Sequence, residues 1–462
     1  MFIAYLEETS ESTERHYAPI ESGVHDTKAP PSTSFEEASP DLPSNEHVAS
    51  VEPVLPELPP SQEPLRSPGF SLDGAGEVVV DTSVYREVFS VSKLDKKYFA
   101  VDFGLGNPTL NPNIIPHPHE KDTWIIVAQR EQGAAENHEV FEEVACNAVF
   151  REDGSLLCST LPKPLPVVPT RSDHCHGELE AFNLAAGPHD MRVFYGPDAP
   201  FSIYGSQSQW ACFGLWAQDF RSLASDDFQL DTLNANLFAN AAELQRPQPW
   251  HEVEKNWFLF WDTQGAPYVH HDIEPKRAFA QVLPDGFVGP DLAPTVAAGD
   301  DTCMARYMPK PAPVDENLHQ ATNSLSVTLC KRSEEACQPN DENTFIMSIF
   351  QYKKYHSWHG VYEPYVMLFQ RNAPFALHAI STKPLWIHGR RPLTKETAEM
   401  FYITSMSWKN HGQRYHGYAD DVLFLSFGIE DERSAAIDVL AGDLLLDMGL
   451  CLDGEGLRFG PA

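Results

Sequence analysis

The chain has 462 residues, with 33 basic and 66 acidic side chains and a formal net charge of -33 at pH 7. This charge argues against nucleic acid as a partner, and equally against an anionic membrane surface, because a phosphate backbone needs a basic face. The hydrophobic fraction of 42% allows a sizeable core, and no apolar run is long enough to predict a membrane span.

The first 80 residues differ in composition from the rest. They hold 15 acidic and 3 basic residues, and 11 of the 38 prolines. Such a segment buries too little apolar surface to offset the entropy lost on ordering. We therefore predict a disordered acidic tail over residues 1–80 and a folded domain over residues 81–462. The start of the chain lacks the basic and apolar regions of a signal peptide, which by itself favours a cytoplasmic protein.

Short strands dominate the rest of the chain. Six β-branched or aromatic runs bounded by Gly, Pro, Asn or Asp predict strands at residues 123–129, 191–195, 257–261, 344–350, 365–369 and 422–427. Candidate helices are few, at residues 223–244 and 435–448. The predicted fold class is all-β.

An internal repeat supports a radial arrangement of sheets. Asp198-Ala-Pro-Phe, Gly265-Ala-Pro-Tyr and Asn372-Ala-Pro-Phe each lie between two strand-like runs, and each predicts a hairpin turn. A further hairpin is expected around Glu152-Asp-Gly-Ser. Repeated hairpins at such spacing predict a five-bladed β-propeller, with a β-sandwich as the alternative.

Four segments resemble blades of known carbohydrate enzymes. They begin at Gly106-Asn-Pro-Thr-Leu-Asn-Pro, Gly187-Pro-His-Asp-Met-Arg, Glu254-Lys-Asn-Trp and His416-Gly-Tyr-Ala-Asp-Asp. Together they are similar to the five-bladed β-mannoside phosphorylase and hydrolase group of the furanosidase superfamily, and most similar to uncharacterised fungal propeller proteins. The resemblance covers roughly residues 100–445. It implies a carbohydrate substrate and a secretory or extracellular location. His189 and Met191 stand where that group has Glu and Pro.

Asp190 is the candidate general acid. Breaking a glycosidic bond requires one group that protonates the leaving oxygen and a second that delivers the acceptor from the other face. Arg192 follows two residues later and is expected on the same side, where it could hold Asp190 or an anionic group. A structural salt bridge between the two is the alternative. Asp420 and Asp421 are the candidate source of the second carboxylate, and a solvated turn is the alternative for them.

Polar residues near predicted strand starts are candidates for binding the substrate. Lys255 beside Asn256 could bind phosphate or a sugar hydroxyl, or could simply cap a strand. His270 and His271 alternate across a strand, so at most one of them faces a pocket. The candidates are Asn107, His189, Arg192, Lys255, Asn256, His271, His319, Asn323 and His416.

No metal site and no cofactor is predicted. Neighbouring histidines such as His117 with His119 lack a second ligand cluster at a recognised spacing. The eight cysteines include no C-x-x-C pair. Cys330 and Cys337 could close a small loop in an oxidising compartment, and free thiols in a reduced protein are the alternative.

The sequence thus predicts an enzyme that cleaves or forms a glycosidic bond with inversion, as a glycoside hydrolase, a phosphorylase or a glycosyltransferase. The alternative is a non-catalytic β-propeller that binds glycan or protein. Trp210, Trp257 and Trp358 are candidate stacking platforms for sugar rings, with core filling as the alternative for each. The predicted partner is a carbohydrate, and the sequence sets no oligomeric state.

Overall fold

The computed structural model describes residues 68–135, 138–183, 187–231, 237–356 and 359–451. Most of the predicted tail lies outside these ranges. The described part opens with a hairpin of β1 (Phe70–Leu72) and β2 (Val78–Val80), whose Phe70 ring lies 5.3 Å from the Trp386 ring. The expected boundary at residue 81 therefore falls just after an ordered hairpin.

The fold is built mostly of strands, as predicted. The largest sheet has nine strands, with order β23-β25-β26-β4-β8-β7-β6-β5 and β9 (Lys163–Pro164) paired to β7. Its strands are β4 (Phe99–Asp102), β5 (Thr109–Pro116), β6 (Trp124–Ala135), β7 (His138–Phe150), β8 (Leu156–Cys158), β23 (Phe401–Trp408), β25 (Val422–Ile429) and β26 (Arg433–Leu440). Strand β4 pairs antiparallel with β26 and parallel with β8, so that it joins the last strands of the chain to the first.

Three further sheets hold most of the other strands. One has order β10-β11-β12-β13, with β10 (His189–Tyr195), β11 (Pro200–Gln207), β12 (Phe213–Asp219) and β13 (Ala242–Glu243). The next is β14 (Phe258–Trp261), β15 (Pro267–Asp272) and β16 (Ala278–Gln281). The third has order β24-β18-β19-β20-β21-β27, with β24 (His416–Tyr418), β18 (Leu325–Thr328), β19 (Thr344–His356), β20 (His359–Gln370), β21 (Leu377–Ser381), β27 (Met448–Leu450) and, paired to β19, β17 (Glu316–His319). A small parallel pair joins β3 (Arg86–Val88) to β22 (Leu385–Ile387).

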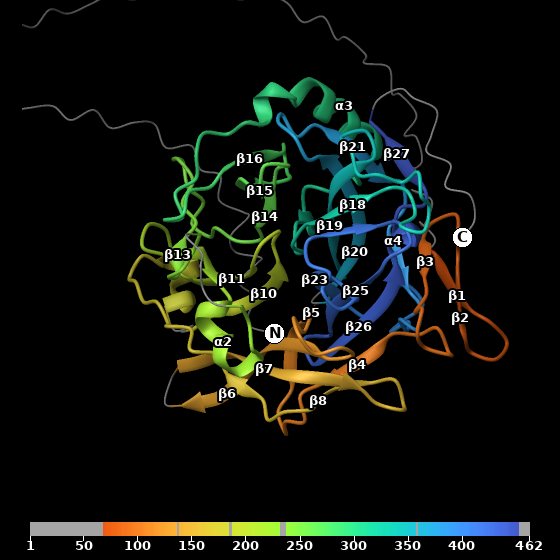
Figure 1. Ribbon diagram of the computed structural model, residues 1–462, viewed down its shortest axis with the longest axis horizontal. Coiled ribbons are helices and arrows are strands. Elements are labelled where there is room, and N and C mark those ends of the chain that lie inside the picture. Colours follow the sequence, from red (N-terminus) through yellow and green to blue (C-terminus); the bar gives the residue numbers. More distant parts are fainter. Residues whose placement is uncertain (1–67, 136–137, 184–186, 232–236, 357–358, 452–462) are drawn as a thin grey trace, which may run out of the picture. The chain divides into compact units, whose positions relative to one another are not determined.

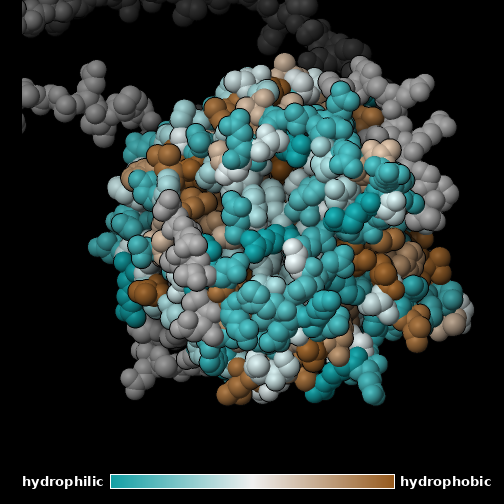
Figure 2. Space-filling model, in the orientation of Figure 1, coloured by the Kyte–Doolittle hydropathy of each residue, from teal (hydrophilic) through white to brown (hydrophobic). Residues whose placement is uncertain are grey.

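These sheets follow one another around a common centre in a propeller-like arrangement (Figure 1). Strands β5, β10 and β23 come from distant parts of the chain and contact one another at that centre. The face seen in Figure 2 is mostly hydrophilic, with hydrophobic residues in separate patches. Among the described residues, no helix is both long and apolar enough to span a membrane.

All six predicted strands and all four predicted hairpins are confirmed. The Ala-Pro turns connect β10 to β11, β14 to β15 and β20 to β21, and the turn after residue 151 connects β7 to β8. In the first of them Gly196 N–H donates to Ala199 O at 2.8 Å, and in the second Asp262 N–H donates to Ala266 O at 3.1 Å. Proline lacks an N–H, and at these turns it leaves the hairpin ladder intact.

The predicted helices are largely wrong. Residues 433–440 form β26, because β25 and β4 flank this apolar run and bury it, and a strand buried in this way lacks the alternation that identifies strands. Of the described residues within 223–244, only those up to Phe228 are helical, in α2 (Arg221–Phe228). The helix α4 (Ala441–Leu444) lies within the predicted range 435–448, whereas α3 (Ala297–Tyr307) was not predicted.

All eight cysteines are paired in four disulfides. The predicted bond between Cys330 and Cys337 is present, and the others are Cys146–Cys158, Cys175–Cys212 and Cys303–Cys451. The alternative of free thiols is therefore wrong for this structure. The bond Cys303–Cys451 joins α3 to the residue that follows β27 and closes a loop across 148 positions of sequence.

Candidate functional site

Asp190 lies near the start of β10 in a left-handed backbone conformation, with φ of 50°. Its N–H donates to Gln129 Oε1 at 2.8 Å, and its Oδ1 accepts a hydrogen bond from Asn111 Nδ2 at 2.6 Å. The pairing of β10 with β11 shifts register between His189 and Arg192, which is a β-bulge. The strand thus turns the Asp190 side chain out of the regular alternation.

Left-handed residues gather around Asp190. Asn111, Asp190, Asn256 and Asp431 have φ between 50° and 64°, and they are four of the twelve non-glycine residues with positive φ in the described chain. Asn and Asp tolerate this conformation better than other side chains, but it still costs free energy. Strained residues of this kind concentrate where function requires a particular side-chain direction.

A cavity of about 30 Å³ lies beside Asp190. Its walls come from β10, β11, β12 and β23 and from the segment that precedes β14. The lining residues are His189, Asp190, Arg192, Gly205, Phe213, Leu215, Lys255, Asn256, Ala321, Tyr402 and Thr404. Five of the predicted site residues therefore meet here: His189, Asp190, Arg192, Lys255 and Asn256. His319 also reaches the group, because its Nδ1 lies 3.2 Å from Asn256 Nδ2.

Burial raises the pKa of Asp190, while the hydrogen bond from Asn111 and the charges of Lys255 and Arg192 oppose that shift. A carboxyl whose pKa is raised in this way stays protonated nearer to neutral pH, as a general acid must. Burial lowers the pKa of His189 to about 4, so this imidazole is neutral. Arg192 donates to Ala321 O at 3.2 Å, and the hydrogen bond to Asp190 comes from Asn111 instead of this guanidinium.

A second partly buried carboxyl lies within electrostatic range of Asp190. Asp431 occupies the turn between β25 and β26, where burial and the charge of Asp190 raise its pKa and Lys353 lowers it. Lys353 on β19 is 1% exposed, and burial lowers its pKa to about 7. Its Nζ lies 4.5 Å from the centroid of the Tyr355 ring. The sequence analysis missed both residues. Lys353 is a lysine within a strand-like run, and Asp431 is an aspartate in the turn between two such runs.

Asn111 was also missed, although the motif that contains it was identified. That motif holds two Asn-Pro pairs, and Asn107 was taken as the pocket residue. The structure places Asn107 on the exposed segment before β5, whereas Asn111 lies within β5 and contacts Asp190. The prediction that Asn107 lies at the pocket is corrected here. Of the two Asn-Pro pairs, only the second lies on β5, the strand that reaches the centre.

Several predicted residues have other surroundings. The His271 Nδ1 atom lies 2.6 Å from Asp272 Oδ2, and its ring packs against buried Trp257. Asn323 bonds the backbone of Met406 through both ends of its amide, at 3.0 and 2.9 Å, which ties the segment before β18 to β23. Trp257 is 1% exposed and fills the core. Trp358 lies outside the described residues.

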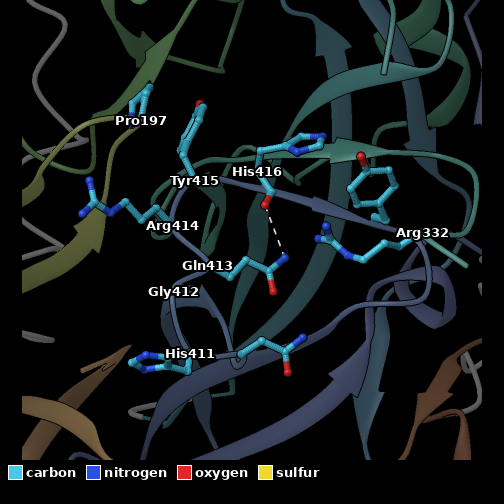
Figure 3. Close-up of a pocket in the computed structure, with 10 residues that line it drawn as sticks. Pro197, Arg332, His411, Gly412, Gln413, Arg414, Tyr415 and His416 are labelled. Atoms are coloured by element: carbon cyan, nitrogen blue, oxygen red, sulfur yellow. Dashed lines mark hydrogen bonds between the residues drawn. The ribbon is translucent and has the colours of Figure 1, made fainter. Parts of the chain in front are cut away.

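His416 lines a different cavity, of about 630 Å³, shown in Figure 3, together with Arg332, which bonds to both Asp420 and Asp421. Arg332 holds both carboxylates: its backbone N–H donates to Asp420 Oδ1 at 2.5 Å, and its guanidinium makes a bidentate pair with Asp421 at 3.0 and 2.5 Å. His416 Nε2 lies 2.8 Å from Thr328 Oγ1. None of His416, Asp420 and Asp421 lines the cavity at Asp190.

The electrostatics of this second group also differ. Burial would raise the pKa of Asp420, but hydrogen bonds from the N–H groups of Arg332 and Ser333 outweigh it and lower that pKa. Burial and the charges of Arg371 and Arg332 lower the pKa of His416 to about 4. Asp420 therefore stays ionised, and Asp421 makes its bidentate pair with Arg332, which is the arrangement of a structural ion pair.

Glu143 on β7 lies behind Asp190 and is 1% exposed. Its Oε1 accepts a hydrogen bond from Met191 N–H at 3.3 Å, and its Oε2 has no hydrogen-bond partner among the described residues. Burial raises the pKa of Glu143 well above its usual value, and the charge of Asp190 adds to the effect. The two carboxyls thus influence each other's ionisation.

Glu143→Gln is expected to change how stability depends on pH. Because the folded-state pKa of Glu143 is raised, its stabilising contribution is complete below the unfolded-state pKa near 4.5 and is lost as pH rises through the folded value. The stability of the wild type minus that of the variant should therefore fall as pH rises from 4 to 7, by up to about 1 kcal/mol per pH unit. Urea unfolding at several pH values measures this difference in stability. A difference that stays constant with pH would show that Glu143 is not a buried neutral acid.

Comparisons with known proteins give likeness to solved structures alone. No family model matches the chain, and no curated protein matches it. A glycosyl hydrolase from Bacteroides ovatus is 10% identical with a TM-score of 0.40, over 77% of this chain and 92% of that one. The β-1,2-mannobiose phosphorylase from Listeria innocua is 10% identical with a TM-score of 0.39, over 78% and 96%.

The catalytic domain of a GH62 α-L-arabinofuranosidase from Coprinopsis cinerea is 8% identical with a TM-score of 0.40, over 77% of this chain and 98% of that one. The similar structures thus include carbohydrate-active enzymes. TM-scores of this size carry no argument about the activity of this chain, so the argument for function rests on the residues around Asp190.

Proposed function

We propose that the chain is a carbohydrate-active enzyme that cleaves or forms a glycosidic bond with inversion, and that Asp190 is its general acid. The observation that carries the proposal is the state of Asp190: a partly buried carboxyl with a raised pKa, on a strained backbone, at a cavity that Arg192, Lys255 and Asn256 also line. A protonated carboxyl can give its proton to the leaving oxygen. The neighbouring cations and amide can hold sugar hydroxyls or an anionic acceptor.

In this proposal Asp431 takes the role of the second carboxylate. Inversion requires a base that activates the acceptor from the opposite face, with the two carboxyls about 6.5–9.5 Å apart. The charge of Asp190 raises the pKa of Asp431, so the two carboxyls lie within electrostatic range, whereas Asp420 and Asp421 are held by Arg332. Burial and the charge of Asp190 raise the pKa of Asp431 and oppose the ionised form that a base needs, whereas the charge of Lys353 favours that form.

The size of the cavity favours a second candidate function. A volume of about 30 Å³ holds a water molecule, whereas small-molecule pockets usually measure about 300–1,000 Å³. In the catalytic proposal the substrate ring lies at the opening, and only the reacting oxygen or the water lies beside Asp190. In the alternative, the chain is a non-catalytic β-propeller that binds glycan or protein, because Asp190 is the single carboxylate that lines this cavity.

The proposed architecture is a propeller of five blades. The nine-stranded sheet would divide between β4 and β8, where the pairing becomes parallel over two residue pairs. Strand β4 would then complete the last blade with β23, β25 and β26, and β5 to β8 would form the first. Such a closure joins the two ends of the folded domain in one sheet.

The proposed compartment is the secretory pathway or the extracellular space. All eight cysteines are paired, and disulfides form and persist in oxidising compartments. This argument comes from the covalent structure and does not depend on how the chain begins.

A substrate screen on the full chain tests the proposed function. Nitrophenyl mannosides, xylosides and arabinofuranosides, and the matching disaccharides, would be supplied with and without inorganic phosphate, and with nucleotide sugars. The anomeric proton of the first product, followed by NMR, should have the configuration opposite to that of the substrate. A product of retained configuration would contradict inversion, and sugar binding without any turnover would favour the non-catalytic alternative.

A further inference from the structure

A third cavity, of about 370 Å³, lies beside β13. Three aromatic side chains line it, together with amides, two carboxylates and small residues. The lining residues are Gln209, Trp210, Trp216, Ala239, Asn240, Ala241, Ala242, Glu243, Gln245, Pro284, Asp285 and Phe287. None of them lines the cavity at Asp190.

Two of the three aromatic rings that line this cavity are unusually exposed. Trp210 is 45% exposed and Phe287 is 50% exposed, and Phe89 is the only other large aromatic with comparable exposure among the described residues. Two of these three rings therefore line one cavity. Large aromatic side chains that stay open to solvent and lie together commonly mark a binding site.

Ordered backbone presents both rings. Trp210 N–H donates to Ser208 Oγ at 2.9 Å, and the Trp210 ring lies 5.9 Å from that of Trp250. Phe287 O accepts from Leu283 N–H at 2.8 Å in a closed turn, and Gln245 N–H donates to Gly286 O at 2.9 Å, which ties the turn to the neighbouring segment. The rings are thus held open, without a collapse onto each other.

The polar lining is just as well fixed. Glu243 is 7% exposed, its Oε2 accepts from Gln209 N–H at 2.8 Å, and its Oε1 accepts from Ser208 Oγ. Trp216 is 6% exposed, and its Nε1 has no acceptor among the described residues. A buried indole N–H without an acceptor costs free energy that a ligand oxygen could recover.

We propose that this cavity binds a ring of a neutral oligosaccharide, as a second sugar site separate from Asp190. A sugar ring has apolar faces that pack on Trp210 and Phe287, and hydroxyls that bond to amides and carboxylates. No Lys, Arg or His lines the cavity, whereas Glu243 and Asp285 do, so an anionic sugar or a phosphate would be repelled. The volume lies in the usual range for small-molecule sites. This inference does not require Asp190 to be catalytic.

The test uses the full chain and three neutral probes: the β-1,4-linked hexasaccharides of glucose, xylose and mannose. Calorimetric titration should show that at least one of them binds, and Trp210→Ala should weaken that binding by about tenfold or more, as should Phe287→Ala. Neither replacement should unfold the chain, because both rings are about half exposed. Binding to none of the three hexasaccharides would overturn the proposal.

Two control variants locate the binding. Phe89→Ala removes a ring of similar exposure elsewhere, 43%, and should leave the affinity unchanged. Asp190→Asn should also leave it unchanged, so failure of the catalytic proposal and failure of this one can be told apart. If Trp210→Ala binds as tightly as the wild type, the sugar binds elsewhere and the assignment of this cavity is wrong.

Discussion

Asp190→Asn is expected to lower turnover of a glycoside by about 10²–10⁴-fold while sugar affinity is largely kept. Asparagine has the size of aspartate and can still accept the hydrogen bond from Asn111, but it cannot give a proton to the leaving oxygen. The variant should fold normally, because burial already penalises the charged form of Asp190 and the amide is neutral. Initial rates on the substrate identified by screening, together with thermal unfolding, measure both quantities.

Asp421→Asn is the matched control for this experiment. It makes the same chemical change at another carboxylate, which is 5% exposed and paired with Arg332. This carboxylate does not line the cavity at Asp190. We expect this variant to lose stability, because it weakens the pairing of a buried carboxylate with a half-exposed arginine, and to keep its turnover per folded molecule. A folded Asp190→Asn protein with full turnover would exclude Asp190 as the acid, and Asp431 would then be the carboxyl to test.

Removing the bond between Cys303 and Cys451 should have the largest effect on stability. The two cysteines are 148 positions apart, and closing a loop of that length reduces the entropy of the unfolded chain by an amount worth about 5 kcal/mol. The double variant Cys303→Ser and Cys451→Ser should lose that much free energy of unfolding, measured by urea denaturation without reductant. It also frees the end of the chain after β27 from α3.

The bond between Cys330 and Cys337 provides the control, because the same chemistry closes a loop across only seven positions. The chain-entropy relation gives about 2 kcal/mol for it, less than half of the other value. Equal losses from the two double variants would show that loop entropy does not govern the stability of this fold. A wild-type protein with titratable thiols under oxidising conditions would contradict the pairing itself.

The strands and their hairpins could be predicted because their signals are local. A run such as residues 422–427 is rich in aromatic and aliphatic side chains, and turn residues such as those after Tyr195 end a strand whatever the distant chain does. Where both faces of a strand are buried, as in β26, the alternation disappears and a helix was predicted instead. The Asp190 neighbourhood was found because an Asp beside an Arg at a strand start is chemically unusual.

The sequence by itself therefore determined the strand class and the hairpins, and it pointed to one carboxyl of the candidate site with its neighbours Arg192, Lys255 and Asn256. Only the tertiary structure decided that Asn111 contacts Asp190 where Asn107 does not, that the charge of Asp190 acts on Asp431, and that Asp420 and Asp421 are paired with Arg332. These contacts join residues 79 or more positions apart. Which of several equivalent polar residues reaches the centre depends on strand register, bulges and left-handed backbone, and packing between sheets selects those features.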